Sequence, residues 1–351
     1  MCLSKDTKQH LSTASKDLAR FPIARIIPVL EKMLRQMASL NSVKKEGGRG
    51  ELWALGMVLG YASVYIFDRI AVIHSDPLVG PFLRTLPSLA LGIFLVWKNG
   101  TLDQLRRASP RYIGRQAIMR FVWAGLLSTF GLFLYYVAIS LGGVVLTAPL
   151  VASYVIWGAL FAWPLLGERL NGAAWGSIGV LVAGLVALAI GESHGQTMPS
   201  HWFWAIPLGA ITAVTYGVSG VFWRDGQLRG AHQSTAILLQ FATTITAAFV
   251  GLAAFGRLSV LFQTPWRDVA ALLASGILSG IVGVYCYFMA LRRMSVARVY
   301  AFAGLQPLLA TLGAYFLLRE FLSPLILGGI LAISVGVTLV QVFRPASERQ
   351  A

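Results

Sequence analysis

Asp68 and Arg69 are adjacent charged residues within one apolar run, and Arg84 lies within the next apolar run. A charge inside a membrane helix costs about 2.5–3.5 kcal/mol near the helix centre, so such residues usually have a function. One hypothesis makes Asp68 a protonatable or ligand-facing carboxylate whose charge is set by Arg69 or Arg84. The alternative is a structural ion pair near the outer membrane interface, or an Arg69 side chain that extends outward to water.

Aromatic and amide side chains supply most other polar groups within the apolar runs. Together with the two charges they are the candidates for a binding cavity: Asp68, Arg84, Tyr65, Tyr154, Trp157, Tyr216, Gln240, Tyr285 and Gln306, with Tyr61, Tyr135 and Tyr287 of the same kind. A cavity lined in this way would suit an amphipathic small molecule. Equally, each tyrosine could bond to a neighbouring helix or lie at the headgroup boundary.

Other chemistries lack their residues. The five histidines lie in the N-terminal tail or near expected loops, and no nucleophile motif or metal-ligand spacing accompanies them, which disfavours an enzyme. Cys2 and Cys286 are the only cysteines, so neither a disulfide nor a metal site is expected. We expect no cofactor and find no nucleotide-binding motif.

Composition predicts an integral membrane protein. Hydrophobic residues make up 56% of the chain and charged residues only 12%. Apolar runs of about 20 residues recur after Glu51, each long enough to cross a bilayer core as a helix. The ten predicted spans are residues 52–73, 77–97, 118–141, 144–166, 173–191, 203–223, 235–255, 269–291, 297–318 and 323–343.

The net charge of +15 follows the expected topology and does not indicate nucleic-acid binding, because no basic groove with interleaved aromatics is apparent. The basic residues gather in the tail 1–50 and in alternate loops, above all between Lys98 and Arg120. Positive residues stay in the cytoplasm, so we expect both termini there, with 1–50 and 345–351 as cytoplasmic tails. The tail 1–50 is expected to be disordered or partly amphipathic.

The sequence repeats itself at an offset of 152 residues. Residues 126–184 align with 278–336 without a gap, and about a quarter of the positions are identical, against about a tenth expected from composition. The matches include Gly131/Gly283, Tyr135/Tyr287, Glu168/Glu320 and Gly184/Gly336. Five spans is an odd number, so residues 51–192 and 202–344 are predicted to be two repeats of opposite membrane orientation.

Two local patterns concern packing. Gly276 and Gly280 have the spacing that lets two membrane helices approach closely, and Gly283 extends it. Glu168 and Glu320 each come just before a helix, where a carboxylate can accept from free backbone amides, so we interpret them as structural turn residues.

Ten spans, the five-plus-five repeat and the LLGERL turn at residues 165–170 resemble the drug/metabolite transporter superfamily, EamA type. QPLLATLGAYFLLRE in the second repeat is similar to the proline-bearing helix and turn of that family. The first repeat departs from it, because Val155 occupies the position of Pro307. The family commonly has an arginine at the position of Arg84, which would bind a substrate carboxylate, Asp68 or backbone carbonyls.

The resemblance implies a carrier in the inner (plasma) membrane that moves an amino acid, a related metabolite or a drug-like compound by alternating access, with export as the expected direction. Asp68 is then the candidate for ion coupling. The partners are the substrate and the lipid bilayer, and a homodimer is left open. The alternatives are a membrane scaffold or sensor without transport, and an intramembrane enzyme; a channel is disfavoured because no filter sequence is apparent.

Overall fold

The computed structural model describes residues 47–167, 172–193, 201–291, 299 and 302–342. These residues are helical, with no strand among them, as expected where lipid leaves backbone groups without other hydrogen-bond partners. Most of the predicted tail 1–50, the whole of 345–351, and Glu168 lie outside the described residues.

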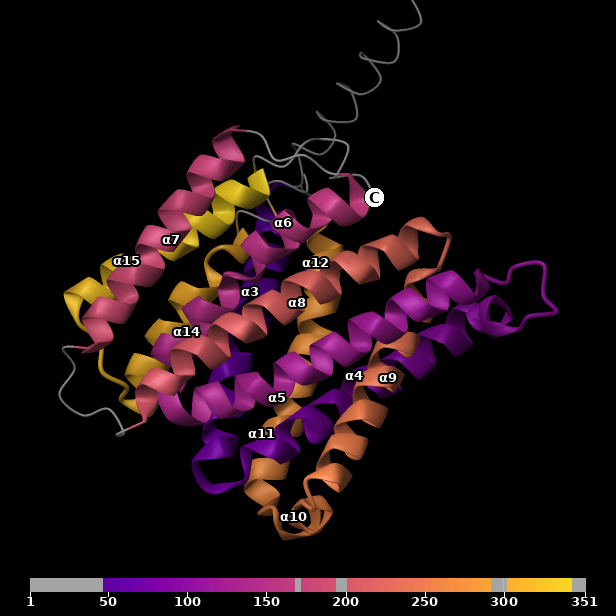
Figure 1. The fold of residues 1–351 in the computed structure, drawn as a ribbon, viewed down its shortest axis with the longest axis horizontal. Coiled ribbons are helices and arrows are strands. Elements are labelled where there is room, and N and C mark those ends of the chain that lie inside the picture. The colour runs from indigo at the N-terminus through magenta and orange to yellow at the C-terminus, as the bar shows by residue number, and fades with distance from the viewer. Residues whose placement is uncertain (1–46, 168–171, 194–200, 292–298, 300–301, 343–351) are drawn as a thin grey trace, which may run out of the picture.

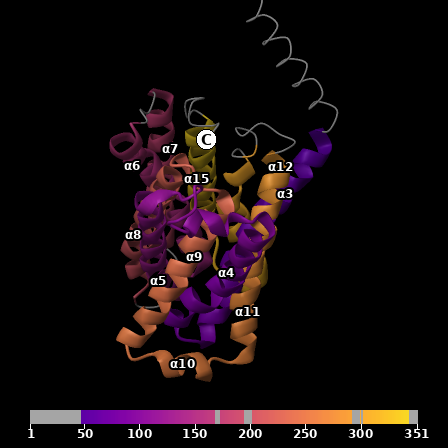
Figure 2. The same ribbon diagram turned by 90° about the vertical axis from the view of Figure 1, so that its right-hand side faces the viewer.

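The helices pack side by side into one bundle (Figures 1 and 2). The first half of the chain contains α3 (Gly47–His74), η2 (Pro77–Val79), α4 (Gly80–Asn99), η3 (Thr101–Leu105), α5 (Gly114–Ala152), α6 (Tyr154–Leu166) and α7 (Gly172–Ser193). The second half contains η4 (Trp202–Trp204), α8 (Ala205–Leu228), α9 (Gln233–Ala254), α10 (Leu258–Gln263), α11 (Trp266–Ile277), η5 (Leu278–Gly283), α12 (Val284–Leu291), α14 (Gln306–Gly313), η6 (Ala314–Leu318) and α15 (Pro324–Val342).

Several of these helices are long and apolar enough to cross a membrane, so the chain is a multi-pass membrane protein. Six stretches meet this criterion by length and composition: Gly50–His74, Pro77–Asn99, Gly114–Leu166, Trp202–Leu228, Gln233–Ala254 and Trp266–Tyr287. Three shorter apolar helices are Trp175–Leu188, Gln306–Leu318 and Pro324–Val340. Each predicted span overlaps one of these nine stretches, two of them falling within Gly114–Leu166.

The predicted spans 118–141 and 144–166 meet at a corner formed by Gly143. Gly143 has φ 69° and ψ −172° inside α5, a backbone conformation that favours glycine. A Cβ at this position would lie 2.7 Å from a carboxylate oxygen of Glu320. The close approach of Glu320 and the left-handed φ therefore both require glycine at this corner.

Helices α7 and α15, the last of each sequence repeat, pack against each other in antiparallel directions. Cβ atoms added at Gly184 and Gly336 would meet Ile333 and Leu181 respectively, each at 2.6–2.8 Å. The two contacts are equivalent under the repeat, because the offset of 152 residues relates Leu181 to Ile333 and Gly184 to Gly336. Such reciprocal contacts are the signature of a two-fold axis between the helices.

The same relation holds elsewhere in the bundle. A Cβ at Gly131 in α5 would contact Tyr216 of α8, and a Cβ at its equivalent Gly283 would contact Tyr61 of α3. Tyr61 therefore corresponds to Tyr216, at an offset a few residues longer than in the later helices. The helix pairs follow the same rule: α3 packs on α11, α12 and α14, and α8 packs on α5 and α6.

Arg84 in α4 corresponds to Gln240 in α9 by this geometry. Gly276 packs against the Arg84 carbonyl and Pro87, and Gly125 packs against the Gln240 carbonyl and Thr243. Gly276 lies 151 residues after Gly125, whereas the offset between equivalent residues after η5 is 152. The π-helical turn η5 accounts for the difference, since a π turn accommodates one additional residue.

We predict that Gly184→Val lowers thermal stability, because the added side chain would collide with backbone atoms of α15 that cannot move aside. The expected loss is about 1–3 kcal/mol, as for other overpacked sites. Thermal unfolding in detergent measures it. Gly176→Val in the same helix is the control, because a Cβ there meets nothing within 4 Å; equal losses in the two variants would contradict the close packing.

Candidate functional site

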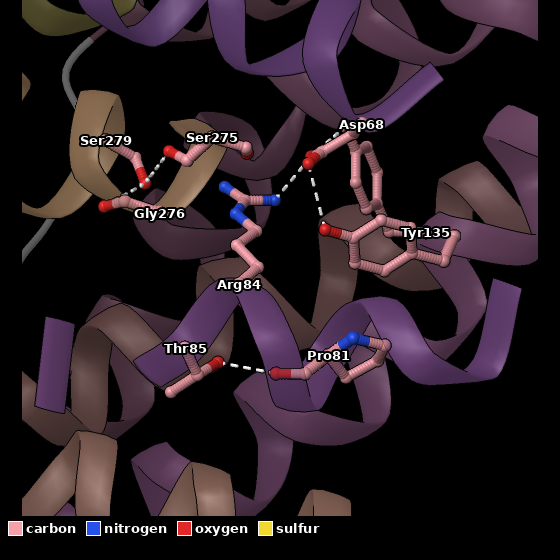
Figure 3. Close-up of polar contacts among 9 residues, drawn as sticks. Asp68, Pro81, Arg84, Thr85, Tyr135, Ser275, Gly276 and Ser279 are labelled. Atoms are coloured by element: carbon pink, nitrogen blue, oxygen red, sulfur yellow. Dashed lines mark hydrogen bonds and ion pairs between the residues drawn. The ribbon is translucent and has the colours of Figure 1, made fainter. Parts of the chain in front are cut away.

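Asp68 is completely buried, and three side chains donate hydrogen bonds to its carboxylate. Arg84 Nη1 and the Tyr135 hydroxyl each lie 2.9 Å from Oδ2. The Tyr136 hydroxyl lies 2.9 Å from Oδ1. Figure 3 shows the Asp68 carboxylate between Arg84 and Tyr135. A buried carboxylate is tolerated when it is both paired with a cation and hydrogen-bonded, and Asp68 meets both conditions.

The neighbouring charge, Arg69, makes different contacts. Its Nη1 donates to the carbonyls of Ile139 and Ser140, both at 2.8 Å, and its Nε lies 3.4 Å from Glu320 Oε1. Adjacent residues project about 100° apart on a helix, which sends Asp68 and Arg69 to different partners. Arg84 rather than Arg69 is therefore the cation paired with Asp68.

Glu320 binds free helix amides, but not those of the helix that follows it. Its carboxylate accepts from the amides of Val144 and Val145, at 2.8–3.1 Å, just after the Gly143 corner of α5. The Glu320 side chain therefore reaches across to α5 and accepts from backbone amides there, and not from those of α15, the helix that follows it in the chain. Arg69, Glu320 and Gly143 together close this end of the bundle.

A cavity of about 460 Å³ is lined in part by Arg84 and Tyr135, two of the partners of Asp68. It is lined by Met57, Tyr61, Val64, Tyr65, Arg84, Tyr135, Val151, Tyr154, Tyr216, Trp223, Tyr287, Ala303 and Gln306. Along α3 it extends from Met57 to Tyr65, and Asp68 follows about one turn later. The cavity therefore faces the N-terminal end of α3, with the Asp68 cluster at its far end.

A second cavity, of about 300 Å³, is lined mainly by hydroxyl and amide groups: Tyr61, Arg84, Thr85, Ser88, Ser128, Leu132, Tyr216, Gln240, Phe241, Thr244, Ser279, Gly280 and Val284. Tyr61, Arg84 and Tyr216 line both cavities. Gln240 Nε2 donates to Ser128 Oγ at 3.2 Å, which holds the amide on the wall.

The lining of the second cavity is almost wholly made of equivalent residues from the two repeats. The pairs are Tyr61/Tyr216, Arg84/Gln240, Thr85/Phe241, Ser88/Thr244, Ser128/Gly280 and Leu132/Val284, and only Ser279 lacks its counterpart. A cavity lined by such pairs lies on the pseudo-two-fold axis. The charge of the cavity lining is not symmetric, because Arg84 in the first repeat is equivalent to the neutral Gln240 in the second.

Six of the nine sequence candidates lie at these walls. Tyr65, Arg84, Tyr154, Tyr216 and Gln306 line the first cavity, and Gln240 lines the second. Asp68 lies behind Arg84 and reaches neither cavity, Trp157 packs its Cβ toward Gly217 of α8, and Tyr285 is 56% exposed with its ring edge-on to Trp53. These three residues are therefore not among the described residues that line the two cavities.

Tyr136 and Trp223 are site residues that the sequence candidates omitted. Tyr136 follows Tyr135, and only the rotation of α5 shows that both rings point at one carboxylate. Trp223 lines the first cavity with its buried indole N–H lacking a partner among the described residues. It is the counterpart of Asp68 at the offset that relates Tyr61 to Tyr216, so the repeat could have indicated it.

Inverted repeats around a central cavity occur in many membrane transporters. The chain belongs to the EamA-like transporter family, whose family model matches residues 48–190 and again residues 203–342. Membership makes it a membrane transporter of small molecules rather than an enzyme.

Solved structures show the same fold. One of the 22 matching chains comes from a crystal structure described only as that of a protein. It has 18% sequence identity and a TM-score of 0.55, covering 87% of this chain and 99% of its own. No curated protein matches the sequence.

We predict that Tyr136→Phe destabilises the fold by about 1.5–3 kcal/mol, because it removes a donor from a buried charged carboxylate. Tyr135→Phe should act in the same direction. Thermal unfolding of the purified protein measures both. Tyr285→Phe is the matched control, since that tyrosine is 56% exposed; a Tyr136→Phe protein as stable as the control would show that the hydroxyl does not support Asp68.

Proposed function

We propose that the protein has ten membrane spans in two inverted five-helix repeats and carries a small amphipathic organic metabolite by alternating access. The observation that carries the proposal is the cavity lined by equivalent residues of both repeats. Substrate sites of carriers with inverted repeats lie near the bilayer midplane at the repeat interface, where each half presents similar walls. Membership of the EamA-like transporter family supports the same conclusion.

The distribution of charge supports an orientation in which the N-terminal end of α3 lies on the cytoplasmic side of the inner membrane. In that orientation the larger cavity faces the cytoplasm. The Asp68 cluster and the corner of Gly143, Glu320 and Arg69 then close the outer side. The structure would correspond to an inward-facing state, ready to load substrate from the cell, and we propose export as the direction of net movement.

The walls favour a molecule with both an apolar body and a polar group. Aromatic rings dominate the larger cavity, and Ser, Thr and Gln side chains dominate the smaller one. Arg84 lies where the two meet. A substrate could thus place its apolar body among the rings and its polar group near Arg84.

Flux into and out of proteoliposomes tests the proposal. Three radiolabelled probes share a phenyl group and differ in charge: phenylpyruvate (anionic), phenylalanine (zwitterionic) and phenethylamine (cationic). We expect saturable flux of at least one probe above that of protein-free liposomes. If none of the three moves faster than in protein-free liposomes, the transport proposal fails for amphipathic metabolites of this kind.

We predict that Ala303→Trp abolishes this flux, because the added ring would fill the larger cavity beside Gln306. A loss of at least about tenfold is expected, with Tm changed little, since Ala303 is only partly buried and lines the cavity. Leu331→Trp in α15 is the control, because Leu331 is 45% exposed on the outside of the bundle. Full flux in the Ala303→Trp protein would exclude this cavity as the transport path.

A further inference from the structure

We propose that Arg84 binds the carboxylate of a small organic anion and that Asp68 takes up one proton as it releases Arg84. Anion and proton then cross the membrane together, so that in the proposed export direction the outward gradient of the anion, and not the proton gradient, drives net movement. This inference rests on the proposed transport function, to which it adds the substrate class and the coupled ion.

Arg84 has N–H groups available for a ligand in the cavities, whereas a ligand there cannot reach the buried Asp68. The Arg84 side chain is 21% exposed and that of Asp68 is fully buried. Arg84 donates to Asp68 from Nη1, and in Figure 3 the other two nitrogens point away from Asp68. A carboxylate entering either cavity would therefore meet a guanidinium edge with free N–H groups.

The walls of both cavities select an anion over a cation. Among the described residues that line them, Arg84 is the only charged one. Gln240, its counterpart in the other repeat, offers an amide on the same second cavity, and Trp223 offers an indole N–H in the first that lacks a partner among the described residues. A carboxylate would meet donors at these walls and no negative group.

Charge neutrality then requires a proton. Arg84 and Asp68 together carry no net charge, so an anion beside them leaves two negative groups sharing one guanidinium in a poorly solvated place. Like charges that share a buried site raise the cost of ionising both, and protonation of one relieves that cost. Of the two, Asp68 has no contact with water that would stabilise its charge once Arg84 has turned to the ligand.

The proton exchange balances and needs no further reactant. The ion pair between Arg84 Nη1 and Asp68 Oδ2 breaks, and an O–H bond forms on Asp68 with a proton that enters as hydronium from solvent. The neutral carboxyl group can then donate to the Tyr135 or Tyr136 hydroxyl, because a hydroxyl both donates and accepts. Release of the anion on the far side reverses each step.

The other ionisable groups near Asp68 do not replace it. Tyr65 and Tyr216 face the cluster from α3 and α8 with phenol groups that stay neutral near pH 7. Arg69 is engaged by Glu320 at the Gly143 corner. Asp268 of α11 accepts from Ser75, which directly follows the end of α3. Apart from Arg84, Tyr135 and Tyr136, no partner of the Asp68 carboxylate occurs in the described part of the chain.

Calorimetric titration of the full-length protein in detergent with phenylpyruvate tests the proposal. Comparing two buffers of different ionisation enthalpy counts the protons taken up per bound ligand. We expect about one proton at pH 7.5, and binding that weakens about tenfold for each unit that the pH rises. Phenethylamine should bind at least about tenfold more weakly than phenylpyruvate.

Two variants sharpen the test. Asp68→Asn should bind phenylpyruvate without proton uptake and without the pH dependence, and Arg84→Gln should lose at least about tenfold in affinity. The proton count on the unmodified protein decides the question even if the Asp68→Asn protein does not fold. Zero proton uptake, or no binding of phenylpyruvate at millimolar concentration, overturns the proposal.

The two proposals fail in different ways. If phenylalanine or phenethylamine crosses proteoliposomes while phenylpyruvate neither binds nor crosses, the transport function stands and the anion assignment fails. If phenylpyruvate binds with one proton but no probe crosses, the site exists and the transport function fails.

Discussion

The burial of the Asp68 carboxylate is the constraint on which the rest of the site depends. A carboxylate without access to water must be matched by a cation and by donors, and removing one partner of such a pair typically costs about 3–5 kcal/mol. Its partners come from α4 and α5, so the requirement ties three helices together at one level of the bundle. It also fixes Arg84 at the cavity wall, because Nη1 must stay 2.9 Å from Oδ2 while the stem extends from α4.

The pseudo-two-fold relation explains where the cavity lies, and the departures from it explain its chemistry. Equivalent residues of the two antiparallel repeats meet at the pseudo-two-fold axis, so both repeats contribute similar walls to the smaller cavity. The charged cluster belongs to the first repeat alone, since Gln240 and Trp223 stand where Arg84 and Asp68 would be expected in the second. The scaffold is thus close to symmetric, while the guanidinium by which we propose that the substrate is recognised belongs to one repeat alone.

Much of the fold could be predicted because the bilayer imposes it. Lipid thickness sets the length of each apolar run, and the predicted spans accordingly overlap helices throughout the described chain. The Gly143 corner illustrates the limit: an interruption near residues 142–143 was expected, but its conformation depends on Glu320, some 176 positions away in sequence. Gly184 and Gly336 were visible as a repeated pair, whereas their contacts required the packed helices.

The site was only partly predictable because helix rotation is a tertiary property. Sequence composition identified the polar residues of the spans, including Arg84 and Asp68, but it left open whether Arg69 or Arg84 is the partner of Asp68. Tyr285 and Trp157 have the same chemistry as Tyr154, and their helices turn them away from the cavities. The equivalence of Arg84 and Gln240 escaped a search at one fixed offset, because the offset shifts between the early helices and the later ones.

The adjacency of Asp68 and Arg69 connects the cavity to the closed end of the bundle. Asp68 is held by the residue that lines the cavities, and Arg69 is held by the Glu320 carboxylate that caps the second part of α5. One short stretch of α3 therefore carries both attachments, and it cannot rotate to follow a displaced Arg84 without moving Arg69 against the Gly143 corner. In the alternating-access function that we propose, a shift of Arg84 at the cavity would therefore reach the Gly143 corner through two neighbouring residues of one helix.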